Sequence, residues 1–301
     1  MRDLDHIFLT RFNLPSGGHE SLVRAQEGWL QQRVELFEKY CLPSVLTQTS
    51  SNFHWIVYFD PQSPDWLRQR ISEWRRNSVL TPIYRATVVR SEMHGDILGA
   101  IGQRGGDLLT TNLDNDDGLA SDFVDRLQAA PYSGVRTAIY LANGLIKHES
   151  RVFTHEDRCN AFCSVRESWE DPIFCWAAPH NRLQEIMPTQ VVSGAPAWLQ
   201  VVHSRNVSNR VHGKLTSPAL YRESFPGLLD EARTPSTLDK VFDAAAARPA
   251  RMVREAVRRM TKATVHGVFG VEGLDRLKRG WKLAGDRLGR RSHEATKANG
   301  R

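Results

Sequence analysis

Three carboxylates fall within four positions at residues 114–117, in the order Asp114, Asn115, Asp116 and Asp117. They follow a short apolar, β-prone run, and no strand would carry such a cluster into a packed core without a cation to neutralise it. If the backbone stays extended, Asp114 and Asp116 project to the same face, because side chains along a strand alternate with a period of two. Paired carboxylate oxygens are typical ligands of Mg²⁺ or Mn²⁺, which proteins commonly share with substrate phosphates.

The same acidic motif, residues 114–117, has a second interpretation as an Asp/Asn-rich turn that leads into a helix. In this interpretation Asp117 or Ser121 caps a helix that runs to Ala130. The motif by itself leaves both interpretations open, and the elements around it must decide between them.

Strands and helices alternate before the acidic motif. The expected strands cover residues 6–12, 52–60 and 83–89, and the expected helices cover residues 27–40, 64–74 and 96–104. With the strand that ends in the acidic motif, these elements predict an α/β fold with an open, largely parallel sheet. In such sheets ligands bind at the carboxyl ends of the strands, where Arg11, Asp60 and Asp114 fall.

After residue 130 the alternation gives way to a mixed arrangement. A hairpin-like pair is expected over residues 138–146 and 152–153, with Asn143 and Gly144 as a turn inside the first segment. A further strand region over residues 188–203 ends in His203. We therefore expect a mostly parallel mixed sheet flanked by helices over residues 1–220, and a basic helical extension over residues 221–301 with a disordered end.

The composition is that of an ordinary globular protein, with 41% hydrophobic and 25% charged residues. The four cysteines form no paired framework, and a chain of 301 residues does not need disulfides, so reduced thiols are expected. The sequence has neither a signal-peptide pattern nor an apolar run of about 18 residues, so we expect neither export nor a membrane-spanning helix.

The net charge of +6 hides an asymmetry along the chain. Residues 248–301 carry fifteen Lys or Arg and five Asp or Glu, a net charge of +10, which leaves −4 for the rest. Apolar and cationic residues are interleaved there at helical spacing, as in an interfacial helix on anionic lipid. A solvated helical extension or an oligomerisation arm is the other interpretation.

Further segments of the chain are distinctive: residues 10–12, 36–45, 48–49, 53–60, 113–117 and 198–203, together with Asn206 and Asn209. In these segments the chain resembles bacterial proteins described as rhamnosyltransferases, which look like GT-A glycosyltransferases of the nucleotide-diphospho-sugar transferase superfamily. This resemblance covers roughly residues 5–215 and leaves the basic tail outside. The resemblance implies a GT-A-like, Rossmann-related fold.

The resemblance also implies that a divalent ion, Mn²⁺ or Mg²⁺, bridges the two phosphates of a nucleotide-diphospho-sugar. Asp116 would be its direct ligand, Asp114 would contact the ribose or the metal and its water, and His203 would close the metal shell. The ion would offset the negative charge that builds up on the departing nucleoside diphosphate. Asp117 would support the ligands or cap the next helix, and a structural role is the alternative for His203.

Further residues would bind the donor if the resemblance holds. Asp60 would accept hydrogen bonds from the base, and Arg11 would lie near the base or the phosphates. Arg210 or Lys214 would pair with the diphosphate. The alternative for Asp60 is a strand-end turn before Pro61.

An inverting transfer would need a carboxylate that deprotonates the acceptor hydroxyl. The candidates for this catalytic base are Glu149, Glu156, Asp157, Glu167 and Asp171. Glu167 is the first choice because the preceding segment, residues 160–165, also resembles the family; a solvated structural acid is the alternative. Trp169 and Trp176, which are flanked by polar residues, are candidate platforms for sugar stacking.

These observations predict a metal-dependent glycosyltransferase that moves a sugar, rhamnose by the resemblance, from a nucleotide-diphospho-sugar to a glycan or lipid-linked acceptor. The basic tail would bind an anionic membrane surface, which suits a cytoplasmic protein at the inner face of the membrane. No nucleic-acid partner is expected, because the body is acidic. A metal-dependent phosphohydrolase or nucleotidyltransferase, and a non-catalytic binding protein that uses the basic tail, are the alternative functions.

Overall fold

The computed structural model describes residues 4–15, 27–77, 80–102, 105–203 and 210–257. The chain divides into two compact units, Met1–Ala245 and Ala246–Arg301. The predicted helical pattern beyond residue 257 and the predicted disordered end lie outside the described residues.

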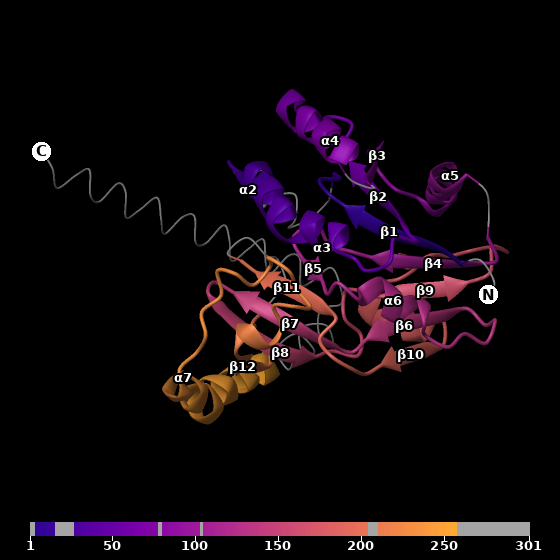
Figure 1. Cartoon of the computed structure of the whole chain (residues 1–301). Helices are drawn as coiled ribbons and strands as arrows, with labels where there is room; N and C mark the ends of the chain where they lie inside the picture. Colours follow the sequence, from indigo (N-terminus) through magenta and orange to yellow (C-terminus); the bar gives the residue numbers. More distant parts are fainter. Residues whose placement is uncertain (1–3, 16–26, 78–79, 103–104, 204–209, 258–301) are drawn as a thin grey trace, which may run out of the picture. The chain divides into compact units, whose positions relative to one another are not determined.

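The first unit contains a seven-stranded sheet in the order β10-β6-β9-β4-β1-β2-β3 (Figure 1). Its strands are β1 (Leu4–Arg11), β2 (His54–Phe59), β3 (Leu80–Tyr84), β4 (Asp107–Asn112), β6 (Thr137–Leu141), β9 (Ser164–Glu167) and β10 (Thr189–Val192). Strand β9 runs antiparallel to both of its neighbours, and the other pairs are parallel. The predicted α/β fold with a mostly parallel mixed sheet is therefore confirmed.

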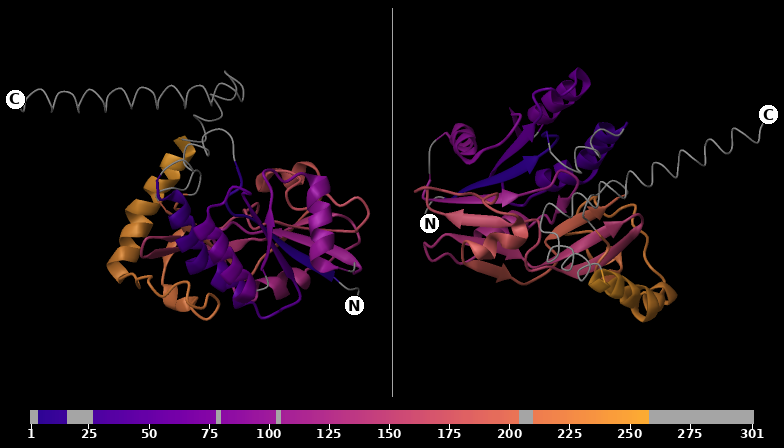
Figure 2. Two further views of the ribbon diagram at one scale, coloured as in Figure 1. Left: turned by 90° about the horizontal axis from the view of Figure 1, so that it is seen from above. Right: turned by 180° about the vertical axis from the view of Figure 1, so that it is seen from behind.

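Helices cover both faces of this sheet, because its strands bury side chains on both. In β2, Trp55 and Val57 join one core whereas Ile56 and Tyr58 join the other. The first core also takes the apolar sides of α4 (Asp65–Asn77) and α6 (Phe123–Gln128), and the second takes that of α5 (Arg90–Ile101). Figure 2 shows the strands and their covering helices from above and from behind.

The first helical segment is longer than predicted. It consists of α2 (Trp29–Leu36), a π-helical turn η1 (Phe37–Cys41) and α3 (Leu42–Leu46), so it continues six residues past the predicted end at residue 40. Pro43 lies in the first turn of α3, a position where its missing N–H is tolerated. Turns of π-helix within α-helices are frequent at functional sites.

A second, five-stranded sheet has the order β12-β8-β7-β11-β5. Its strands are β5 (Gly118–Leu119), β7 (Asn143–His148), β8 (Arg151–Glu156), β11 (Trp198–Val202) and β12 (Lys214–Thr216). The predicted turn at Asn143 and Gly144 is wrong, since β6 ends at Leu141 in one sheet and β7 begins at Asn143 in the other. Gly144 serves packing instead: a Cβ there would lie 2.0 Å from Cδ2 of Trp198.

The chain directly after residue 220, the predicted start of the extension, belongs to the first compact unit. The segment after η3 (Pro218–Leu220) buries Phe225, Leu228 and Leu229 in a third core, against Tyr40 and Leu199. Helix α7 (Thr237–Phe242) belongs to the first unit, and η4 (Asp243–Ala247) begins in it. Buried Asp243 at the start of η4 accepts a hydrogen bond from the backbone N–H of Leu215 at 3.0 Å.

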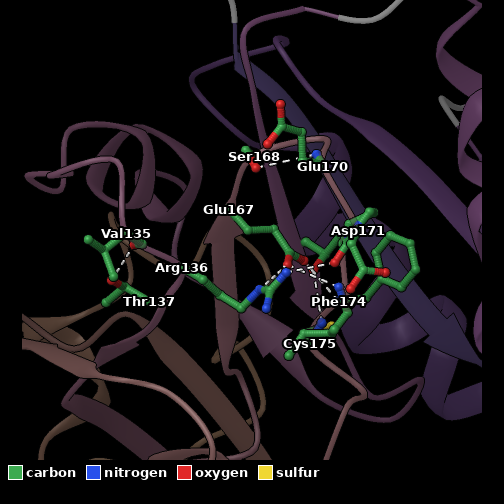
Figure 3. Close-up of polar contacts among 12 residues, drawn as sticks. Val135, Arg136, Thr137, Glu167, Ser168, Glu170, Asp171, Phe174 and Cys175 are labelled. Atoms are coloured by element: carbon green, nitrogen blue, oxygen red, sulfur yellow. Dashed lines mark hydrogen bonds and ion pairs between the residues drawn. The ribbon is translucent and has the colours of Figure 1, made fainter.

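Glu167, the predicted catalytic base, is a fully buried structural residue (Figure 3). Its Oε2 accepts hydrogen bonds from Nε of Arg136 at 2.6 Å and from the N–H of Ile173 at 3.0 Å, and its Oε1 accepts from the N–H of Phe174 at 2.8 Å. These bonds hold a loop in which Phe174 has a left-handed backbone with φ 64°. Both carboxylate oxygens accept hydrogen bonds within the protein and are shielded from solvent, which favours a structural role for Glu167 over that of a base.

We expect Glu167→Gln to destabilise the protein by about 2 kcal/mol, because the amide nitrogen cannot accept the bonds that one carboxylate oxygen accepts. Urea unfolding followed by circular dichroism measures this change. The matched control is Glu170→Gln, three residues along and exposed, which we expect to change stability by less than about 0.5 kcal/mol. Equal stability of the two variants would contradict the structural role of Glu167.

Candidate functional site

The carboxyl ends of β1, β2 and β4 meet at one edge of the seven-stranded sheet. Leu9 in β1 pairs with Asn112 in β4, and Arg11 pairs with Tyr58 in β2. Because the three strands are parallel, the residues that follow them lie along the same edge. The structure thus places Arg11, Asp60 and the acidic motif together.

The acidic motif is a turn and not the extended end of a strand. Strand β4 stops at Asn112, and the N–H of Asp117 donates to the carbonyl of Asp114 at 3.3 Å. The expectation that Asp114 and Asp116 share a face by strand alternation is therefore wrong, although the two carboxylates interact. Desolvation by the surrounding chain, followed by the negative charge of Asp116, raises the pKa of Asp114.

Asp116 is buried and lies between two cationic partners. Its Oδ2 lies 2.8 Å from Nη1 of Arg33 and 2.9 Å from Nε2 of His203. Burial acts to raise the pKa of Asp116, but the hydrogen bond from His203 and the charge of Arg33 outweigh it and hold that pKa below its usual range. Asp116 is thus a carboxylate whose charge is stabilised by residues from α2 and from the end of β11.

Asn115 fixes the turn against β1 and α2. Its Nδ2 donates to the carbonyls of Arg11 at 2.6 Å and Phe12 at 2.8 Å, and its Oδ1 accepts from Nη1 of Arg33 at 2.8 Å. The Asn115 side chain thus bonds the last carbonyl of β1 and the next one, and so it sets the position of the neighbouring Asp116.

Asp117 has no exposed surface and supports β11. Its Oδ1 accepts from the N–H of Val201 at 2.8 Å, whereas its Oδ2 has no partner among the described residues. Burial, followed by the charges of Asp116 and Asp114, raises the pKa of Asp117 well above its usual range. Asp117 does not cap the next helix, since α6 begins after Asp122 without a side-chain cap.

A pocket of about 390 Å³ opens beside the carboxyl end of β1. It is lined by Arg11, Val88, Arg90, Met93, Ile173, Trp176, Ala177 and Ile186. The guanidinium of Arg11 lies 4.0 Å from the ring centroid of Trp176, and Nε1 of Trp176 donates to Oδ1 of Asn112 at 2.7 Å. The pocket therefore combines two cationic side chains with an aromatic face, and hydrogen bonding connects it to the end of β4.

The other predicted donor-binding residues are Asp60, Lys214 and Arg210. Oδ1 of Asp60 accepts from the N–H of Gln62 at 2.8 Å, which is the strand-end turn given above as its alternative. Lys214 is exposed on β12, three strands from β11 and hence about 14 Å away at the usual strand spacing. Arg210 is exposed, and the polar segment before it, residues 204–209, lies outside the described residues.

Arg33 belongs to the site but was not predicted from the sequence. A signal was present, because Arg33 lies four residues from Trp29 and four from Phe37, on the face of the helix that these two aromatic residues bury. A charged residue on the buried face of an amphipathic helix needs a partner. The sequence does not show that this partner is Asp116, 83 positions further along.

Asp114, Asp116 and His203 are the residues of the site whose side chains could hold a divalent cation. The separation of 2.9 Å between Nε2 of His203 and Oδ2 of Asp116 is close to the distance of about 3 Å between adjacent ligands of an octahedral ion. Asp114 could supply a further oxygen and Asp117 has a buried unpartnered one. In the described part of the chain no three His, Cys, Asp or Glu residues form a metal-binding group, and Arg33 contacts the Oδ2 that a cation would use.

Solved structures similar to the chain share little sequence with it. The mannosyltransferase PcManGT from Pyrobaculum calidifontis, in complex with GDP-Man and Mn²⁺, is 12% identical; the match covers 93% of this chain and 80% of that one with a TM-score of 0.40. S. aureus TarS is 12% identical, with 66% of this chain and 37% of TarS covered and a TM-score of 0.38. The chain thus spans little more than a third of TarS.

A third structure, the inositol-1-phosphate CTP transferase from T. maritima, is 9% identical, with 77% of this chain and 100% of that one covered and a TM-score of 0.38. No curated protein sequence matches the chain.

A family match covers most of the first unit. The family described as "Putative rhamnosyl transferase" matches residues 5–215, which include all but the first and last residues of the two sheets, and the whole acidic motif. This range agrees with the extent of the resemblance given in the sequence analysis, roughly residues 5–215. The chain therefore belongs to this rhamnosyl transferase family of glycosyltransferases.

Proposed function

We propose that the chain transfers a sugar from a nucleotide-diphospho-sugar to a hydroxyl acceptor at the edge where β1, β2 and β4 end. The observation that carries this proposal is the buried, cation-paired Asp116 in a turn next to a pocket lined by Arg11, Arg90 and Trp176. Anionic and cationic groups at one strand edge suit a ligand that brings phosphates and a metal ion. Membership of a glycosyltransferase family favours sugar transfer over the two alternative functions.

In this proposal Asp116, Asp114 and His203 hold Mn²⁺ or Mg²⁺. When bound, the ion would neutralise negative charge on the departing nucleoside diphosphate. The pocket takes the nucleoside: Trp176 offers a stacking face, and Arg11 offers planar donors to base or phosphate. Asp60 remains a candidate partner of the base, because it lies at the same edge.

Two of the other predicted acids are better placed than Glu167 to act as the catalytic base. Glu149 directly follows His148, which pairs with Val202, the neighbour of His203. Asp157 begins a loop whose residue Ala161 accepts a hydrogen bond from Asn112 at 2.8 Å. We propose that one of these two carboxylates deprotonates the acceptor if the transfer inverts. Rhamnose as the sugar rests on the family description alone.

We also propose that the C-terminal region binds an anionic membrane surface from the cytoplasmic side, where it would meet a lipid-linked or envelope glycan acceptor. The charge of +10 over residues 248–301 supports this. So do apolar side chains on α7, with Leu238 80%, Val241 58% and Phe242 65% exposed. None of the helices within the described residues has the length and apolar character needed to cross a bilayer.

Asp116→Ala should abolish the Mn²⁺-dependent binding of nucleoside diphosphates, because it removes the carboxylate that meets both His203 and the proposed ion. Isothermal titration with UDP, GDP and dTDP, each with and without Mn²⁺, measures the effect. His203→Ala should weaken Mn²⁺ binding by about tenfold or more.

Asp122→Ala is the matched control for Asp116→Ala, since Asp122 is half exposed and pairs only weakly with Arg126 at 3.7 Å; it should bind as the wild type does. Asp116→Asn repeats the test with the side-chain shape kept. Unchanged Mn²⁺-dependent binding by a folded Asp116 variant would remove the metal assignment.

A chain that ends at Ala247 should stay folded but lose its binding to vesicles that contain phosphatidylglycerol. This truncation keeps Asp243, which accepts from the N–H of Leu215, and removes the basic segment. Vesicle co-sedimentation measures binding, and neutral phosphatidylcholine vesicles are the lipid control. A full-length chain with Arg258, Arg259, Lys278 and Arg279 changed to Gln should also bind less. Equal sedimentation of all three proteins would exclude the membrane role.

A further inference from the structure

Arg33 is a cation built into the carboxylate site from outside the acidic motif. Its side chain is only 17% exposed, and its guanidinium carbon lies 5.2 Å from the ring centroid of Trp29, one helical turn earlier. A partly buried guanidinium next to an aromatic ring keeps its charge and has few directions in which to move. The helix therefore presents a fixed positive charge to the turn.

Both contacts of Arg33 with the turn use one nitrogen, Nη1. It lies 2.8 Å from Oδ2 of Asp116 and donates to Oδ1 of Asn115 at 2.8 Å. A guanidinium has five N–H donors, and Nη1 carries two of them, so three donors are engaged by neither oxygen. Asn115 is a neutral anchor, and its bond can persist if another cation takes Asp116.

The oxygen that Arg33 contacts is also the one that meets His203. A divalent cation bound by Asp116 and His203 would use this Oδ2 and would lie close to the guanidinium. Like charges at such a distance repel strongly in a site with little water. Arg33 and a divalent cation are therefore competitors for the same carboxylate oxygen.

We propose that Arg33 balances the charge of Asp116 before the donor binds, and that it passes to the diphosphate when a divalent cation takes Asp116. This inference rests on the proposed function and adds a diphosphate-binding residue to it. In the bound state Asn115 would keep the guanidinium near the turn, and the remaining N–H donors would face phosphate oxygens, for which the planar fork of Arg is well suited.

Removal of Arg33 changes the binding of Mn²⁺ in opposite directions, depending on whether Arg33 competes for Asp116 or only supports the turn. If Arg33 only supports the turn, its removal weakens the binding of metal and nucleotide together. If Arg33 competes for Asp116 and binds the diphosphate, its removal strengthens the binding of Mn²⁺ alone and weakens that of the nucleotide.

The experiment compares wild-type protein, Arg33→Gln and Arg33→Lys at full length. Free Mn²⁺ is measured by electron paramagnetic resonance in titrations without nucleotide, and the affinity for UDP, GDP or dTDP, whichever binds the wild type, is measured by calorimetry at saturating Mn²⁺. For Arg33→Gln we expect several-fold tighter Mn²⁺ binding and nucleotide binding weakened by about tenfold or more. For Arg33→Lys we expect Mn²⁺ binding near that of the wild type and weaker nucleotide binding, because the charge is kept and the fork is lost.

Arg70→Gln is the matched control, because Arg70, like Arg33, contacts the side-chain oxygens of two residues, here Glu38 and Glu73, but from an exposed position on α4; it should match the wild type in both titrations. Weaker binding of both ligands by Arg33→Gln, or no change in either, would overturn the inference while leaving the proposed function intact. If Arg33→Gln does not fold, unweakened nucleotide binding by Arg33→Lys overturns it. A wild-type protein that binds neither Mn²⁺ nor any of the three nucleotides would overturn the proposed function, and the inference with it.

Discussion

The buried carboxylate of Asp116 needs cationic partners, and these come from two distant parts of the chain. A carboxylate removed from water is costly unless positive or hydrogen-bonding partners surround it. Arg33 comes from the first helix and His203 from the end of β11, and both lie within 2.9 Å of the same oxygen. The first βα unit, the acidic turn and the second sheet must therefore be placed correctly for this one interaction to form.

The acidic residues at the two ends of β4 differ in how they are paired. At its amino end, Asp107 pairs with Arg166 at 3.2 Å, and Glu167, opposite Leu108, is fully bonded by Arg136 and the backbone. At its carboxyl end three carboxylates are crowded into one turn. Acids with matched partners hold the fold together, whereas a local excess of negative charge is typical of a site that takes a cation.

The pocket and the acidic turn are parts of one hydrogen-bonded edge. Trp176 donates a hydrogen bond to Asn112, the last residue of β4, and its ring makes a cation–π contact with the guanidinium of Arg11, the last residue of β1. Asn115 then donates to the carbonyl of Arg11. A group bound in the pocket and a cation bound at the turn would thus be positioned by the same strand ends, which suits a donor with a nucleoside at one end and a diphosphate at the other.

The sequence by itself determined the α/β class and the strand edge where Arg11, Asp60 and the acidic motif meet, because hydrophobic periodicity and strand order are local signals. It also predicted His203 near Asp116, through a family resemblance that extends over both segments. Only the tertiary structure decided that Glu167 is buried with both oxygens bonded, that the motif is a turn, and that Arg33 contacts Asp116. Those outcomes depend on burial and on partners many residues away, and spacing along the chain does not encode them.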